Sequence, residues 1–223
     1  MKVLVIAPHP DDETLGCGGA LLRLMRERPD AELHWVIVTE MPSGAQWPEA
    51  RAAARRDEIA AVAGKLKTRQ VHQLGFPAAR LDTVPMADLV GALSQVMAAV
   101  QPDTVFVPCR HDVHTDHRYV FDAASACVKS FRYPSVRRVL AYETLSETEF
   151  GLDPSVGAFR PNLWIDISED LEAKIELLEV YAGEMGVFPF PRSREAVEAL
   201  ARMRGATAGV PAAEAFMLLK QVI

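Results

Sequence analysis

The feature that most constrains the fold is a repeated alternation of short apolar runs with longer helical patterns. The apolar runs are rich in Val, Ile and Leu and almost continuous, which is typical of strands in a sheet that is covered on both faces. Strands and helices in alternation form right-handed βαβ units. We therefore expect an α/β, Rossmann-like, doubly wound and mostly parallel sheet flanked by helices, with a helical C-terminal tail. The expected strands cover residues 2–7, 32–39, 70–74, 104–107, 137–141 and 162–167, and the expected helices cover residues 13–28, 48–65, 85–100, 117–129 and 169–182.

Length and composition narrow the classes of protein that fit. A chain of 223 residues can bury one sizeable core, so we expect a single domain over residues 1–223. The net charge of −6 argues against a broad nucleic-acid interface, which depends on neutralising phosphates. We expect no signal peptide and no integral membrane segment, and three widely spaced cysteines suggest no disulfide framework. The expected setting is the cytoplasm, and the expected partner is a small molecule.

Two loops that follow expected strands hold most of the chemically active side chains. Residues 8–14 follow the strand at 2–7, and residues 108–117 follow the strand at 104–107. In an open parallel sheet, ligands bind outside the carboxyl ends of the strands, because the loops converge there. The two loops contain four of the six histidines and five carboxylates: His9, His111, His114, His117, Asp11, Asp12, Glu13, Asp112 and Asp116.

Imidazole and carboxylate donors in these loops predict a catalytic metal site. Such a zinc site has three protein ligands and leaves a fourth position for water. His9, Asp12 and His117 would supply this set. His9 and Asp12 are three positions apart, so at a helix entry both can face one point while Asp11 points elsewhere. We expect one zinc ion per chain, with other divalent ions able to substitute.

The neighbouring residues suit hydrolysis of an amide by a metal-activated water. A bound metal lowers the pKa of water to about 7. Asp11 is then the candidate general base, and His114 would either protonate the leaving amine or stabilise the oxyanion. Asp116 or Asp112 would orient a histidine.

Each motif alone has an ordinary structural explanation. An Asp-Asp pair at a helix start is commonly an N-cap, and a His-x-x-His pair is commonly solvated or packed. Their joint occurrence after two strands favours catalysis. Gly16, Gly18 and Gly19 lack the dinucleotide-binding spacing, so close packing of the first helix on the sheet explains them better. For the same reason Glu40 is not interpreted as a ribose-binding acid.

The motif Pro-His-Pro-Asp-Asp-Glu at residues 8–13, with Asp112-x-His114-x-Asp116-His117 far downstream, resembles the LmbE-like, or PIG-L, deacetylase family. The resemblance implies a Rossmann-like fold and zinc-dependent N-deacetylation of N-acetylglucosamine-type groups. It also implies that His9, Asp12 and His117 bind the metal, that Asp11 is the base, and that His114 is the acid or oxyanion stabiliser, held by Asp116. Further shared segments are Leu74-Gly75-Phe76, Tyr142-Glu143, Phe159-x-Pro161-Asn162, Lys174, Arg204-Gly205 and Glu214-Ala215-Phe216.

Some features leave alternatives open. Tyr181-Ala182-Gly183-Glu184 stands where relatives often have Tyr-x-Ser-Gln, which puts the sugar contacts in doubt. Arg55, Arg56 and Glu58 match an Arg-x-x-Glu motif or form a solvated helical pair. Glu214, after Pro211, equally fits the first turn of a helix. The apolar residues 187–191 fit burial against the chain's own domain, a pocket wall or a homo-oligomer contact. The roles of Arg55, Arg56, Glu184, Arg204 and Glu214 are not assigned by the sequence.

The leading hypothesis is a hydrolase that removes the acetyl group from an N-acetylated amino sugar, whether free, in a glycoconjugate or linked to a nucleotide. One alternative is an amidase that cuts a larger acyl or thiol-conjugate amide. Another is a sugar- or nucleotide-binding protein without turnover. Loss of Asp11 or of a metal ligand would favour the binding protein, and all of these residues are present.

Overall fold

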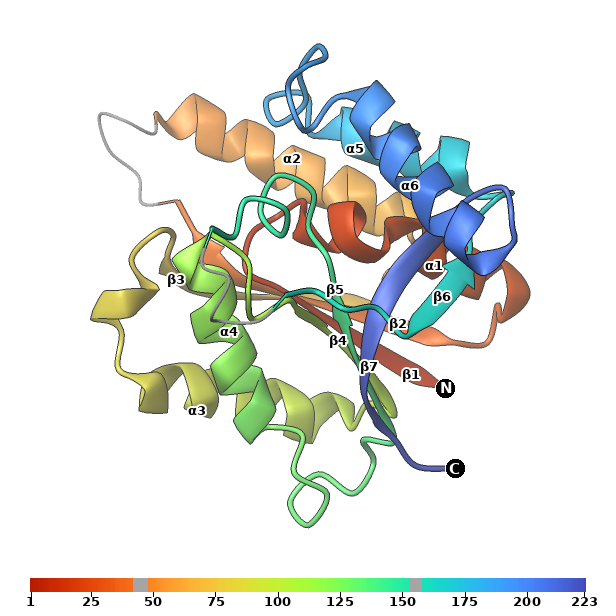
Figure 1. Cartoon of the computed structure of the whole chain (residues 1–223). Coiled ribbons are helices and arrows are strands. Elements are labelled where there is room, and N and C mark those ends of the chain that lie inside the picture. The colour runs from red at the N-terminus through yellow and green to blue at the C-terminus, as the bar shows by residue number, and fades with distance from the viewer. Residues whose placement is uncertain (42–47, 153–157) are drawn as a thin grey trace.

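A seven-stranded sheet lies between two layers of helices in the computed structural model, which describes residues 1–41, 48–152 and 158–223 (Figure 1). The strands are β1 (Lys2–Ala7), β2 (Glu32–Glu40), β3 (Gln70–Pro77), β4 (Thr104–Pro108), β5 (Arg138–Tyr142), β6 (Leu163–Asp166) and β7 (Ala213–Gln221). The helices are α1 (Asp12–Glu27), α2 (Glu49–Lys65), α3 (Met86–Val100), α4 (Thr115–Ala126), α5 (Leu171–Val180) and α6 (Arg194–Ala208), with a short 3-10 turn, η1 (Leu81–Thr83).

The order of the strands places the two informative loops side by side. The sheet runs β3-β2-β1-β4-β5-β7-β6, and β1 pairs in parallel with both β2 and β4. The chain therefore winds outward in one direction from β1 and in the other from β4. Their carboxyl ends adjoin at this switch point, where a doubly wound sheet opens its crevice. The expected Rossmann-like, mostly parallel architecture is confirmed.

Both faces of the sheet are buried, as the apolar strands predicted. Val3 and Val5 of β1 pack in the core below α1 and α2, while Leu4 and Ile6 pack in the opposite core against α3 and α4. Figure 1 shows α1, α2, α5 and α6 over one face and α3 and α4 over the other. Among the described residues, no helix has the length and apolar character needed to cross a membrane.

The C-terminal region departs from the expectation in its last segment. Helices α5 and α6 form the expected helical tail, but the chain then enters β7, which pairs antiparallel with β5 and β6. Residues 213–218 are nearly continuous in apolar side chains, and the strand satisfies the backbone groups at the edge of β5. Glu214 consequently lies in a strand and not in the first turn of a helix.

Helix α1 packs on the sheet without space for side chains at two glycines. A Cβ atom on Gly16 would lie 2.2 Å from the Tyr142 ring, and one on Gly19 would lie 2.8 Å from the side chain of Ile167. These distances are far shorter than a van der Waals contact. They confirm that the glycines allow close packing of the first helix.

A buried ion pair joins α1 to the C-terminal elements. Lys174 Nζ of α5 lies 2.6 Å from Glu214 Oε1 of β7, and both side chains are buried. Lys174 also donates to the Leu15 carbonyl, while the Glu214 carboxylate accepts from the backbone N–H groups of Gly19 and Ala20. The pair therefore holds the middle of α1 by its backbone.

Replacing Lys174 with methionine should destabilise the fold strongly, because it leaves the Glu214 carboxylate buried without its cation. We expect the free energy of unfolding in urea to fall by about 3–5 kcal/mol. Glu172→Gln, which removes an exposed partner of Arg194, is the control and should cost less than about 1 kcal/mol. Equal effects of the two substitutions would contradict a structural role for the buried pair.

Candidate active site

Two helix starts form one wall of a cavity at the switch point of the sheet. The loop after β1 leads into α1 at Asp12, and the loop after β4 leads into α4 at Thr115. The cavity has a volume of about 410 Å³ and is lined by His9, Asp11 and His114 from these loops. Its other walls come from β2, α2, the segment after β3 and the loops that carry Glu147, Glu184 and Arg192.

Three potential metal donors converge beside this cavity. Asp12 Oδ2 lies 3.2 Å from His9 Nδ1 and 3.3 Å from His117 Nε2. The donor atoms of the three residues all lie within 4.8 Å of one another. Two imidazoles and one carboxylate around one point match the donor set of an open zinc site. The structure thus brings together the three residues that the sequence proposed as ligands.

Two further carboxylates hold the remaining ring nitrogens of the histidines. Asp112 Oδ2 lies 2.7 Å from His117 Nδ1, and Asp116 Oδ2 lies 3.1 Å from His9 Nε2. Each contact fixes the ring orientation and directs the other nitrogen toward Asp12. Asp116 also accepts from the backbone N–H groups of Ala79 and Leu81.

The contact of Asp116 differs from the sequence-based expectation, in which Asp116 holds His114. The carboxylate contacts His9, and the link to His114 runs through the backbone N–H of Asp116, which donates to His114 Nδ1 at 3.2 Å. The reason is local: His114 is the N-cap of α4, so its ring accepts from the first turn of that helix. His9, His114 and Asp116 form a second group of possible donors, but this group shares His9 with the first.

The tautomer of His114 follows from its hydrogen bond. Because Nδ1 accepts an N–H, a neutral ring carries its proton on Nε2. Burial lowers the pKa of His114 to about 4, and the neighbouring His9 and His117 rings add to the effect. His114 is therefore a neutral hydrogen-bond donor at pH 7, at a ring-centroid distance of 4.5 Å from His9.

Asp11 lies next to the donor group and has an unusual backbone. Its φ of 124° is rarely adopted by residues other than glycine and costs about 1–3 kcal/mol. Its side chain makes no cap to the helix, and instead Asp11 Oδ2 accepts from Arg192 Nη1 at 2.7 Å. Burial raises the pKa of Asp11 to about 8, with the Asp12 carboxylate adding to the rise and Arg192 opposing it. A divalent cation beside Asp12 would lower this value.

The histidine donors are surrounded by negative charge. Burial disfavours the imidazolium of His9, but hydrogen bonds to Asp116 and Asp12 outweigh it and raise the pKa to about 9. For His117, burial is likewise outweighed by Asp12 and Asp112, and the pKa rises to about 10. An environment that stabilises two imidazolium ions also suits a divalent cation, which fits the donor chemistry.

Sequence reasoning missed Arg192 and Glu147. Arg192 Nη2 lies 3.4 Å from Glu147 Oε1, and Arg192 lies 181 positions from the Asp11 that it contacts. No short motif marks such a pair. The only nearby signal is the Pro-rich stretch at residues 187–191, which ends just before Arg192.

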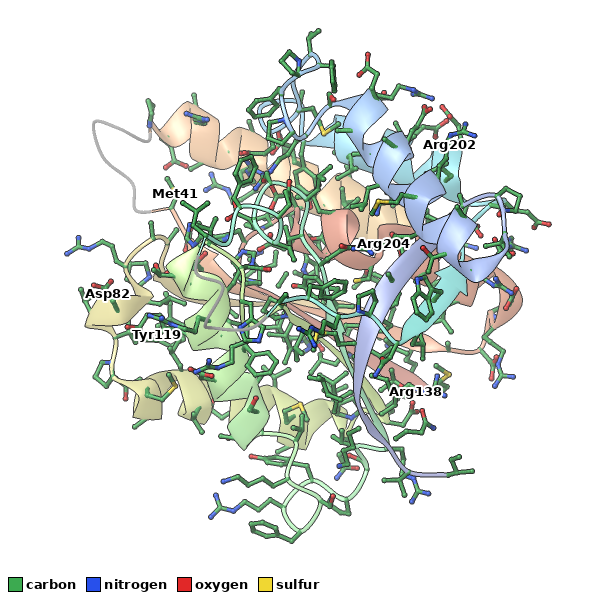
Figure 2. The ribbon with its side chains drawn as sticks, viewed as in Figure 1. Met41, Asp82, Tyr119, Arg138, Arg202 and Arg204 are labelled. Carbon is green, nitrogen blue, oxygen red and sulfur yellow. The ribbon has the colours of Figure 1, made fainter. Side chains whose placement is uncertain are left out.

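The residues without an assigned role divide into two groups. Arg55 and Glu184 form an ion pair and, with Arg56, line the cavity. Arg204 Nε instead donates to Glu143 Oε1 at 2.8 Å, and Figure 2 shows Arg204 on α6, well apart from Met41 at the cavity wall. Glu214 belongs to the buried pair with Lys174.

The apolar stretch at residues 187–191 is not buried against the described chain. Val187, Phe188 and Phe190 are 85%, 63% and 47% exposed. Burial in the chain's own core, one of the alternatives considered, is therefore wrong for these three side chains.

Comparisons with known proteins are consistent with this arrangement. The family model described as "PIG-L: GlcNAc-PI de-N-acetylase" matches residues 4–128. A diacetylchitobiose deacetylase from Thermococcus kodakarensis is 26% identical over 197 residues, which cover 82% of this chain and 70% of that protein. The conserved protein TT1542 from Thermus thermophilus superposes with a TM-score of 0.78 at 29% identity, covering 99% of this chain and 96% of the other.

The same fold also occurs in a protein that is named as a hydratase and not as a deacetylase. The 4-carboxy-2-hydroxymuconate hydratase GalB from Pseudomonas putida superposes with a TM-score of 0.71 at 21% identity, covering 100% of this chain and 97% of that one. The fold alone therefore does not specify the reaction.

Zinc binding should release protons and strengthen as the pH rises. With pKa values of about 9 and 10, His9 and His117 are protonated at pH 7 before zinc binds, and a ligand imidazole must be neutral. We expect about two to three protons to be released per zinc near pH 7, two from the rings and up to one from Asp11, whose pKa of about 8 the cation would lower. The affinity should rise between about pH 6 and pH 8. Calorimetry in two buffers with different ionisation enthalpies counts the protons.

The control for this measurement is His117→Ala, which should lose most of the zinc affinity. An affinity that does not depend on pH, with no proton release, would remove His9 and His117 from the ligand set.

Proposed function

The chain belongs to the PIG-L family, and on this premise we propose that it is a metal-dependent N-deacetylase that removes the acetyl group from an N-acetylated amino sugar. The observation that carries the proposal is the convergence of His9, Asp12 and His117 beside Asp11 and His114 at one cavity. Ligands, a base and a hydrogen-bond donor are then available together, as amide hydrolysis requires. We propose that the activity belongs to one domain over residues 1–223.

His9, Asp12 and His117 would hold one divalent ion, and two imidazoles with one carboxylate favour zinc. When bound, such an ion would supply positive charge that acidifies water and polarises an amide carbonyl. Asp112 and Asp116 bind the outer nitrogens of the two rings. The inner nitrogen of each ring then faces the ion with its lone pair.

The chain's own groups perform the proton transfers. Asp11 accepts a proton from the water whose oxygen attacks the amide carbon. His114 donates a hydrogen bond from Nε2 to the carbonyl oxygen as negative charge develops on it. With its lowered pKa, neutral His114 is better suited to this role than to that of general acid. Asp11 then returns the proton to the amine as the C–N bond breaks, and acetate and the free amino sugar leave.

The cavity supports a sugar substrate. Its volume of about 410 Å³ is within the range of roughly 300–1,000 Å³ for small-molecule sites. Its walls carry guanidinium groups and carboxylates together, which offer donors and acceptors to hydroxyl groups. The family description and the name of the deacetylase relative are the reason for choosing an N-acetyl amino sugar as the substrate. The three free, buried cysteines suit a reducing compartment, and we propose the cytoplasm.

Asp11→Asn should abolish most turnover while leaving the metal in place. Loss of a general base lowers kcat by roughly 100- to 10,000-fold, and Asp11 is not among the three donors. His114→Ala should also lose turnover and retain metal. The measurement is kcat together with elemental analysis of each variant, and metal loss in either would show that the division between ligands and catalytic residues is wrong.

The substrate assignment is tested by a panel of free, nucleotide-linked and antibiotic-linked N-acetyl amino sugars, with amides of larger acyl groups alongside. We expect metal-dependent release of acetate from at least one sugar, measured directly. Turnover of the larger amides only would favour the amidase alternative. Binding of a sugar with no turnover of any compound would favour a non-catalytic sugar-binding protein.

A further inference from the structure

Arg192 stands at the base of a closed loop that reaches from α5 to α6. Gly186 and Ser193 form a bridge across this loop, and the Gly186 N–H donates to the Arg192 carbonyl at 3.1 Å. The Phe190 ring packs on Gly186, where a Cβ atom would lie 2.5 Å from it. The backbone that carries Arg192 is therefore held in place by contacts within its own loop.

The guanidinium group is fixed by residues from several segments. Nη1 donates to Asp11 Oδ2 at 2.7 Å, and Nε donates to Ser146 Oγ at 2.7 Å. Glu147 lies 3.4 Å and Glu184 lies 3.7 Å from the terminal nitrogens. The side chain is only 15% exposed and lines the reaction cavity. Because the guanidinium of Arg192 is planar and has several N–H donors, it can bind Asp11 and Ser146 in two fixed directions at once.

We infer that Arg192 is a positioning residue for the catalytic carboxylate of Asp11. Arg192 holds Oδ2, and no other side chain among the described residues donates a hydrogen bond to Oδ1, so Oδ1 is left to accept the proton of the attacking water. The inference rests on the proposed function, because it assigns Asp11 as the base.

An alternative is that Arg192 only neutralises buried carboxylates and so stabilises the fold. Asp11, Glu147 and Glu184 all face its guanidinium. A purely structural cation would lower stability when removed, but its loss would not act on kcat through Asp11. A second alternative is direct binding of substrate, which would change KM.

A double-mutant cycle separates these roles. Using the sugar that the panel identifies, we expect Arg192→Gln to lower kcat by about 10- to 100-fold in the zinc-loaded enzyme, because a misplaced catalytic group loses rate steeply. KM should change by less than about threefold. In the Asp11→Asn background, the same substitution should change kcat by less than about twofold, since its effect passes through Asp11. Arg192→Lys should recover part of the loss.

An equal loss of kcat in both backgrounds, or a rise in KM with kcat unchanged, would overturn the inference. Arg194→Gln is the matched control, since Arg194 is exposed and contacts Glu172, Glu179 and Glu198 instead of Asp11. It should leave kcat within about twofold of the wild type. If Arg192→Gln does not fold, Arg192→Lys takes its place in the same double-mutant cycle with Asp11→Asn.

A readout without turnover keeps the inference separate from the proposed function. Urea unfolding of the same variants should show that the loss of stability in the double variant is smaller than the sum of the single losses, because the two residues share one contact. Additive losses would overturn the inference even if the sugars are hydrolysed. If the losses are not additive but no sugar is hydrolysed, the proposed function is refuted, and with it the role of Arg192 in positioning a base.

Discussion

Helix α1 packs on the sheet with its backbone almost in contact with side chains of β5 and of the segment after β6. Gly16 faces the Tyr142 ring and Gly19 faces Ile167, so the helix cannot shift toward the sheet or rotate about its axis without a clash. The Lys174–Glu214 pair also holds the backbone of α1, through the Leu15 carbonyl and the Gly19 N–H. Since Asp11 and Asp12 stand at the first turn of this helix, the packing sets where their carboxylates lie.

The site concentrates charges that a protein interior ordinarily excludes. Although burial opposes it, His117 and His9 hold the pKa of Asp12 well below its usual range, so that carboxylate stays ionised. Four aspartates and two histidines share a small volume, and the strained backbone of Asp11 adds to the cost. Such a cluster is tolerated because each charge has a partner, and the sheet and two helix starts supply the rigid support that keeps the partners together.

Local patterns made the parallel core and the convergence of the three candidate donors predictable. The apolar runs mark β1 and β4, and the spacing of His9 and Asp12 at a helix entry anticipated their convergence with His117. Strand β7 was not anticipated, because its short apolar run also fits a helix, and pairing with β5 and β6 decides between the two. The contact of Asp116 with His9 and that of Arg192 with Asp11 join residues more than 100 positions apart, and no local rule encodes them.

The cavity is built from two kinds of segment, and this has a consequence for how such a protein can change over generations. The donors sit on the tightly packed starts of α1 and α4, whereas the opposite walls belong to α2 and to the loops around Glu147 and Glu184. Substitutions in the loops, and at positions of α2 other than the buried Ile59 and Val62, need not disturb the core, because loops and exposed positions tolerate sequence change better than packed ones do. Lineages can therefore diverge in the molecules they accept while inheriting an unaltered centre. A library of variants confined to Arg51, Ala52, Arg55 and Arg56, which line the cavity from α2, would sample that freedom in the laboratory.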